Sequence, residues 1–297
     1  MVSAYRLYGG RHDDSRHPRP HEPRRSAGTP HGDQASRRLV AQPLGGLAQL
    51  GPLVDILAAQ RQVVTIDGPG YGTSSPIHRD FSLGECASAA GEVLDTLGLG
   101  AADWVGNAWG GHVGIMLAAT EPHRLRSLTT IAAPVLPVSR RQRWTQTYPL
   151  AAAYRLLGPN PLLTKILFDV LLGGADIART PRAAELKAAF RAMDHESARR
   201  TIRYMHSWQS LAGQLATVTV PTLLMTGDLG DQHWSPADAR AAADTMPHAR
   251  VVPLTGSGHV GPLLVDTDAM AAAVTDFWQS PPVVPRDPGA LPTREQT

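Results

Sequence analysis

The sequence lacks most of the features that would place it outside the soluble globular enzymes and binding proteins. Its 297 residues include one cysteine, Cys86, so no intramolecular disulfide is possible. No apolar run approaches the roughly 20 residues that a bilayer-spanning helix needs, and the N-terminal segment has no apolar core typical of a secretory signal. The formal net charge is only +2. We therefore expect a cytoplasmic protein without a nucleic-acid or membrane partner.

The two ends of the chain differ in composition from the middle. Residues 1–37 are crowded with Arg, His, Pro and Gly, and only residues 2–8 among them have the character of a short strand. Residues 281–297 are rich in proline. Such segments bury too little apolar surface to offset the entropy cost of ordering, so we expect a disordered arm and a disordered tail. An arm that binds an anionic partner and a wrong translation start are alternatives for residues 1–37.

Between the ends, apolar strands alternate with amphipathic helices. Strands are predicted at 39–41, 62–67, 103–106, 128–133, 221–226 and 250–254, and helices at 47–58, at 83–97, after residue 108, from 236, and up to 277. Ser82 and Glu85 match a capping box that would begin the second of these helices. This alternation predicts a doubly wound, mostly parallel sheet.

One segment interrupts the alternation. Helical patterns around 148–157, 162–172, 181–193 and 197–211 follow one another without a strand. We therefore divide the chain into a core formed by residues 38–134 and 216–280 and a helical cap formed by residues 135–215. Inserted after a strand, the cap should lie over the carboxyl ends of the strands, where open α/β sheets bind ligands.

The strand at 103–106 runs into a turn dense in glycine, and an alanine-rich helix follows it. Gly106 and Gly110 stand at the two glycine positions of G-x-S-x-G, a sharp strand-to-helix turn that exposes a nucleophile above a parallel sheet. Larger side chains would collide with such a turn. The residue between the glycines is Ala108, whose methyl group cannot act as a nucleophile.

Two further motifs follow later strands. Residues 226–231 read Thr-Gly-Asp-Leu-Gly-Asp, and residues 256–259 read Gly-Ser-Gly-His. With the turn at Ala108 and the Asp-Gly-Pro-Gly-Tyr-Gly loop from Asp67, these motifs make the chain resemble the α/β-hydrolase fold family over about residues 38–280. The resemblance implies the α/β-hydrolase fold with a helical cap insertion. It also implies that Ala108 stands at the nucleophile position, Asp231 is the acid and His259 is the base.

The acid has an alternative, because Asp228 lies in the same loop as Asp231. We prefer Asp231, since a loop one residue longer than usual preserves its reach, although it could also be a turn-forming aspartate. The resemblance further implies that the backbone amides of Trp109 and Leu44 form the oxyanion hole. Gln42-Pro43 replaces the family's usual His-Gly there, which changes the geometry expected of that loop.

Several aromatic residues have two interpretations. The Ala-Trp-Gly-Gly sequence from Ala108 lies between two family patterns: Asp-Trp-Gly-Gly resembles epoxide hydrolases and haloalkane dehalogenases, and Ser-x-Gly-Gly resembles esterases. Trp109 could equally fill the core. Tyr148, Tyr154 and Tyr204 could donate to an epoxide oxygen, as in that branch, or could pack between helices. The same choice between lining the pocket and packing applies to Trp144, Trp208 and His206, and packing is the preferred interpretation.

Ala108 leaves three functional hypotheses. The first is a small-molecule hydrolase, or hydrolase-like enzyme, of ester or epoxide type that relies on His259 and Asp231 to activate water. The second is an inactive pseudo-hydrolase that binds an apolar small molecule in the capped pocket. The third is a serine or aspartate hydrolase whose nucleophile was deliberately replaced. The presence of both a histidine and a nearby aspartate favours the first, and neither a cofactor nor a metal is expected.

Overall fold

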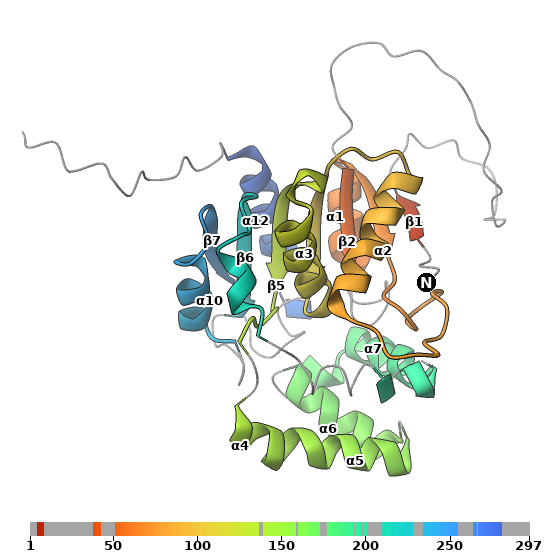
Figure 1. Ribbon diagram of the computed structural model, residues 1–297. Helices are drawn as coiled ribbons and strands as arrows, with labels where there is room; N and C mark the ends of the chain where they lie inside the picture. The colour runs from red at the N-terminus through yellow and green to blue at the C-terminus, as the bar shows by residue number, and fades with distance from the viewer. Residues whose placement is uncertain are drawn as a thin grey trace, which may run out of the picture.

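A seven-stranded sheet forms the centre of the computed structural model, with helices on both faces (Figure 1). The strand order is β1-β3-β2-β4-β5-β6-β7. The structure describes residues 5–8, 38–42, 51–136, 139–158, 160–172, 177–192, 194–197, 199–200, 210–227, 234–254, 264–265 and 267–280.

All neighbouring strands are parallel except for the pair formed by β1 and β3, which confirms the predicted doubly wound, mostly parallel sheet. The strands are β1 (Tyr5–Tyr8), β2 (Arg38–Gln42), β3 (Gln62–Ile66), β4 (Ala102–Asn107), β5 (Leu125–Ile131), β6 (Thr222–Gly227) and β7 (Ala249–Leu254). Every residue of β4 and β6 is buried. Central strands are covered on both faces, which is why the sequences of β4 and β6 do not alternate between apolar and polar residues; the buried Asp103 and Asn107 of β4 are hydrogen-bonded.

Two layers of helices cover the sheet. One face carries α2 (Leu83–Thr96), α3 (Trp109–Thr120) and α10 (Pro236–Ala243), and the other carries α1 (Gly51–Ala58) and α12 (Thr267–Gln279) (Figure 1). The predicted capping box of α2 is confirmed, since the Ser82 hydroxyl accepts from the Glu85 amide while the Glu85 side chain accepts from the Ser82 amide.

The edge strand β1 corrects one expectation. Residues 5–8 were expected to belong to a disordered arm, but they pair antiparallel with β3, so that Tyr5 stands opposite Ile66. An edge strand exposes unpaired amides and carbonyls, and pairing with another segment satisfies them. The rest of residues 1–37 and the expected tail at 281–297 lie outside the described residues.

Between β5 and β6 the described residues form helices and no strand. These are α4 (Arg140–Gln142), η2 (Arg143–Thr147), α5 (Tyr148–Leu157), α6 (Pro161–Leu171), η3 (Ile177–Arg179), α7 (Pro181–Ala192) and the single turn α9 (Ala212–Leu215). We call residues 135–215 the helical insertion; α4 to α7 lie beyond one end of the sheet (Figure 1). Most of the helix predicted at 197–211 lies outside the described residues.

Candidate active site

The turn between β4 and α3 has the backbone geometry expected of a nucleophile elbow. Ala108 adopts φ 48° and ψ −110°, a conformation that costs a non-glycine residue about 1–3 kcal/mol. Its amide donates to the carbonyl of Ile131 at 2.8 Å, and its carbonyl accepts from the amide of His112 at 3.1 Å. The strained residue is therefore fixed to the neighbouring strand on one side and to the first turn of α3 on the other.

Close approach of backbones explains the glycines of this turn. A Cβ atom on Gly106 would lie 2.2 Å from the carbonyl carbon and oxygen of Gly110, which is far inside van der Waals contact. One on Gly111 would lie 2.5 Å from Cβ of Ala133, at the end of the neighbouring strand. The Trp104 indole donates to the Gly110 carbonyl at 2.9 Å from below the turn. The helix α3 can therefore start directly against β4 only because these positions lack side chains.

Ala108 places no reactive atom at the top of this turn. Its side chain is a methyl group with 1% of its surface exposed. The neighbouring Asn107 is also buried, and its amide nitrogen donates to the Ile131 carbonyl at 3.0 Å, so this side chain supports the turn from the side of β5. In the described residues, the turn therefore has the geometry and backbone groups of a nucleophile elbow, but no nucleophile.

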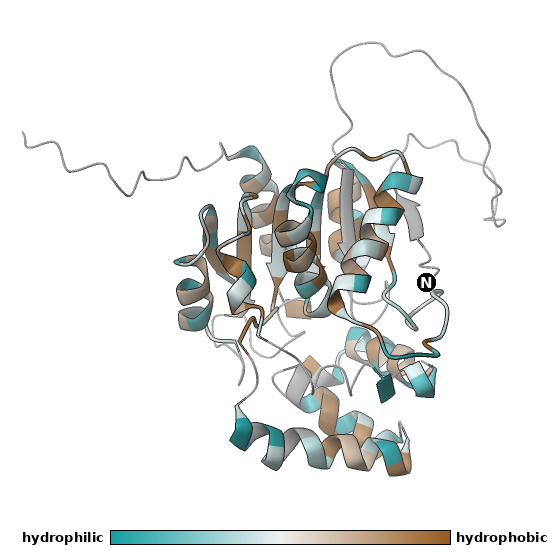
Figure 2. Ribbon diagram, in the orientation of Figure 1, coloured by the Kyte–Doolittle hydropathy of each residue, from teal (hydrophilic) through white to brown (hydrophobic). Residues whose placement is uncertain are grey.

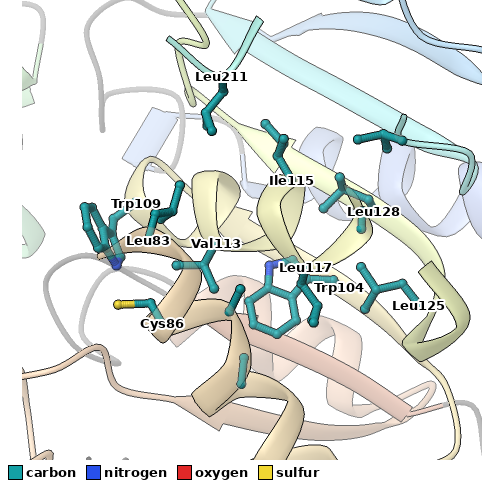
Figure 3. Packing of buried hydrophobic residues seen from close by; sticks show 14 of the residues in the cluster. Leu83, Cys86, Trp104, Trp109, Val113, Ile115, Leu117, Leu125, Leu128 and Leu211 are labelled. Carbon is teal, nitrogen blue, oxygen red and sulfur yellow. The ribbon is translucent and has the colours of Figure 1, made fainter. Parts of the chain in front are cut away.

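The side chain of Trp109 packs in the core. Its ring meets Phe81 edge to face, with 5.8 Å between centroids, and Figure 3 shows it beside Leu83 and Cys86. This supports the interpretation of Trp109 as a core residue. Its backbone amide begins α3, where the partial positive charge of a helix N-terminus favours a developing oxyanion.

The loop after β3 is organised by Asp67. The buried carboxylate accepts from the amide of Thr73 at 3.1 Å and from its hydroxyl at 3.2 Å. Gly72, at φ +53°, passes so close that a Cβ there would lie 2.3 Å from the Asp67 carboxylate. The glycine-rich loop singled out in the sequence is therefore a folded structure at the carboxyl end of β3.

The helical insertion contacts this loop through Ser197, a residue that the sequence analysis did not single out. Ser197 is fully buried, and its hydroxyl accepts from the amide of Ile77 at 2.7 Å. It also packs tightly against Gly70, where an added Cβ would lie 2.4 Å from the Cβ of Ser197. Its amide donates to Asp194 at 2.8 Å, and this hydrogen bond holds the pKa of Asp194 below its usual value. Ser197 thereby joins the insertion to the loop after β3.

Seven of the predicted site residues lie outside the described residues. These are Leu44, Asp228, Asp231 and His259, together with Tyr204, His206 and Trp208 of the helical insertion. The strands that precede the acid and base are described: Gly227 ends β6 and lies opposite Leu254 at the end of β7. Because all strands from β4 to β7 are parallel, their carboxyl ends share one edge of the sheet with Ala108.

The described aromatic residues of the insertion do not follow one pattern. Tyr154 is buried and stacks on His195, with 5.5 Å between ring centroids, so it packs within the insertion. Burial, and to a lesser extent Asp194, raises its pKa. Trp144 is 66% exposed and contacts Tyr148 edge to face, so it packs against a neighbour on the surface of the insertion and not in the core.

A parallel sheet with a strained, glycine-enclosed turn after its central strand defines a class of α/β enzyme folds. A family model described as the alpha/beta hydrolase family matches residues 31–273. The chain belongs to the alpha/beta hydrolase family.

Several characterised or solved proteins are similar to this chain at modest identity. A pimeloyl-(acyl-carrier protein) methyl ester esterase of Xanthomonas campestris pv. campestris is 29% identical over 236 residues, 76% of this chain and 88% of that protein. A putative carbamate hydrolase RutD of Azorhizobium caulinodans is 38% identical over 87 residues, and this match spans 29% of the present chain and 33% of the relative. The enol-lactonase from Burkholderia xenovorans LB400 superimposes with a TM-score of 0.77 at 22% identity, over 94% of this chain and 96% of that one, which shows a shared fold.

Proposed function

We propose that the chain is a small-molecule hydrolase that uses His259 and Asp231 to activate water directly, without a covalent intermediate at residue 108. The observation that carries the proposal is the strained turn at Ala108, which keeps the geometry of a nucleophile elbow although its side chain is a methyl group. The two distant relatives named above whose names specify an ester or lactone reaction make a carboxylic ester or lactone the substrate class of choice.

The proposed reaction runs in two steps. His259 takes a proton from water as its oxygen attacks the substrate carbonyl, while Asp231 orients the imidazole and stabilises its protonated form. The amides of Trp109 and Leu44 stabilise the oxyanion of the tetrahedral intermediate. Collapse of the intermediate breaks the bond to the leaving oxygen, which receives the proton from His259.

Such an enzyme should be slow compared with its serine relatives. Serine hydrolases stripped of triad members keep a rate roughly 10³–10⁴ above that in water, which comes from the oxyanion hole and substrate binding. The parent protein should accelerate the hydrolysis of activated esters by about the same factor over the reaction in water. It should release the leaving group without a burst, because no acyl-enzyme accumulates.

Ala108→Ser tests the placement of the elbow. A serine there adds one oxygen to the existing methyl group, so it should create a nucleophile within reach of His259. We expect release of nitrophenol from a short-chain ester to rise by about a hundredfold or more and to show a burst. We also expect covalent labelling of residue 108 by a fluorophosphonate, detected by mass spectrometry, whereas the parent protein is not labelled.

The matched controls are Ala108→Ser/His259→Ala and His259→Ala. Both should lose the activity that depends on the base, and the double variant should resist labelling. Ala108→Asp tests the epoxide branch, because an aspartate nucleophile opens epoxides and alkyl halides.

The second candidate function is a pseudo-hydrolase that binds an apolar small molecule, which the missing nucleophile at Ala108 favours. It predicts that the parent and His259→Ala show the same background rate. If Ala108→Ser, shown to be folded by circular dichroism, is neither labelled nor activated, the binding protein becomes the better description.

A further inference from the structure

The helix that begins the insertion exposes large apolar side chains. From α4 through η2 to α5, the residues at a spacing of four are Arg140, Trp144, Tyr148, Ala152 and Leu156, and all five are exposed. Trp144 is 66% and Leu156 80% exposed. Residues four apart are neighbours on a helix surface, so these five form a continuous exposed row that winds along the helix.

The start of α6 extends this apolar surface. Eight large hydrophobic side chains of the described residues are exposed, and six of them lie on η2, α5 and α6. We call these six the outer face: Trp144, Tyr148, Leu156, Leu157, Leu162 and Ile166. Figure 2 shows hydrophobic segments along α5 and α6, at the end of the molecule away from the sheet. A concentration of this kind, rather than scattered single residues, marks an interaction surface.

The charge around the outer face is predominantly positive. Between Glu121 and Asp169 the sequence contains no acidic residue. The same helix carries Arg140, Arg141 and Arg155, all exposed, and in the described residues none of these three forms an ion pair. The net charge of +2 for the whole chain conceals this local excess of positive charge.

We propose that the outer face docks on an anionic lipid surface. Tryptophan and tyrosine favour the boundary between headgroups and acyl chains, leucine inserts below it, and arginine binds the phosphates. No described helix is long and apolar enough to cross a membrane, and the proposed contact is peripheral. This departs from the expectation of no membrane partner, which rested on the net charge of the whole chain.

A second copy of the chain fits this surface less well. In a two-fold dimer the same patch meets itself, so arginines from both copies would come together. The one carboxylate on α4 to α6 is Asp169, and it already pairs with Lys165, so these helices hold no further acidic group to neutralise the arginines. An anionic surface provides the opposite charge that such a dimer lacks.

The test uses the full chain and sedimentation with vesicles of two compositions. One is pure phosphatidylcholine, and the other contains about one third phosphatidylglycerol. We expect binding to the anionic vesicles, weakening as salt is raised, and little binding to the neutral ones. Tryptophan emission should shift to the blue on binding, since Trp144 is exposed while Trp104, Trp109 and Trp234 are buried.

Two pairs of substitutions separate the roles of charge and apolar contact. Arg140→Gln/Arg141→Gln should weaken binding by about thirtyfold, since each basic residue at an anionic surface contributes about a factor of five. Trp144→Ser/Leu156→Ser should abolish both the binding and the blue shift. The control Arg191→Gln/Arg240→Gln removes the same charge from exposed positions on α7 and α10 and should leave binding unchanged.

Three results would overturn the proposal. The first is absence of binding to anionic vesicles by the parent protein. The second is equal loss of binding in the control and in Arg140→Gln/Arg141→Gln. The third is a concentration-dependent dimer, measured by light scattering, that Trp144→Ser/Leu156→Ser dissociates while the parent binds no vesicle; the outer face would then be a self-association interface. None of these outcomes depends on the proposed hydrolysis.

Discussion

Gly106→Ala is the substitution whose effect follows most directly from the geometry of the turn. The added Cβ would lie 2.2 Å from the Gly110 carbonyl and 2.4 Å from the amide nitrogen of Gly111, whereas real Cβ atoms essentially never come within 3.0 Å of a non-bonded heavy atom. Both obstacles are backbone, so no side chain can rotate away. To make room, α3 must move from β4, which strains the hydrogen bonds from Trp104 to Gly110 and from Ala108 to Ile131.

Overpacking a core typically costs about 1–3 kcal/mol, and more where the surroundings cannot yield. We therefore expect Gly106→Ala to lower the free energy of unfolding by about 3 kcal/mol or more. For a chain of this size each kcal/mol corresponds to roughly 2–4 °C, so Tm should fall by about 6 °C or more. Urea unfolding followed by circular dichroism, together with a thermal scan, measures both quantities.

The matched control is Gly213→Ala. Gly213 lies in α9, and a Cβ there would meet no atom within 4 Å. Because alanine is the better helix former by about 1 kcal/mol, this variant should be as stable as the parent or slightly more stable. If Gly106→Ala stays within about 1 kcal/mol of the parent, α3 does not approach β4 as closely as described, and the assignment of an elbow at Ala108 loses its support.

Two further predictions concern buried groups away from the turn. Burial, and to a lesser extent Glu85, raises the pKa of the Cys86 thiol to about 12, so a disulfide reagent at pH 8 should modify it only at the rate of unfolding. Because the unfolded thiol ionises near pH 8.5 while the folded one stays neutral, this residue should also lower stability as the pH rises from about 9 toward 12, and Cys86→Ala should remove that contribution. Rapid modification of the folded protein would contradict the burial. Asp103 pairs with the buried Arg61, so Asp103→Ala should cost about 3–5 kcal/mol in urea unfolding, whereas Asp95→Ala, which breaks an exposed pair, should cost far less. Equal costs would show that the Asp103 pair is not buried in solution.

Local patterns predicted the central elements well. The strand predicted at 221–226 is β6 at Thr222–Gly227, and the helix predicted at 148–157 is α5 with the same bounds. The strand predicted at 128–133 is β5 at Leu125–Ile131. The prediction extended the strand to residue 133, but the backbone already turns at Ala132, where φ is 47°. Alanine rarely adopts that conformation, so nothing in the local sequence marks it.

Local sequence patterns could not predict the contacts between segments that are distant along the chain. The burial of Ser197 depends on its meeting Ile77 and Gly70, more than a hundred residues earlier in the chain. The exposure of Trp144 was missed for the opposite reason, because large aromatic residues usually find a core and the interpretation followed that average. In the candidate site, glycine spacing located the turn at Ala108, whereas the assignments of Asp231 and His259 rest on resemblance.

The described part of the chain has two non-glycine residues with positive φ, Ala108 at 48° and Ala132 at 47°. They follow the neighbouring strands β4 and β5, and the amide of Ala132 donates to Met225 in β6 just as that of Ala108 donates to Ile131 in β5. Each such residue costs about 1–3 kcal/mol and persists only where surrounding contacts hold it, a condition met most often at functional sites. Two of them at one edge of the sheet support placing the candidate site there without any reference to the identity of residue 108. For this reason the loss of a nucleophile at that residue argues against a covalent intermediate, but not against chemistry at this edge.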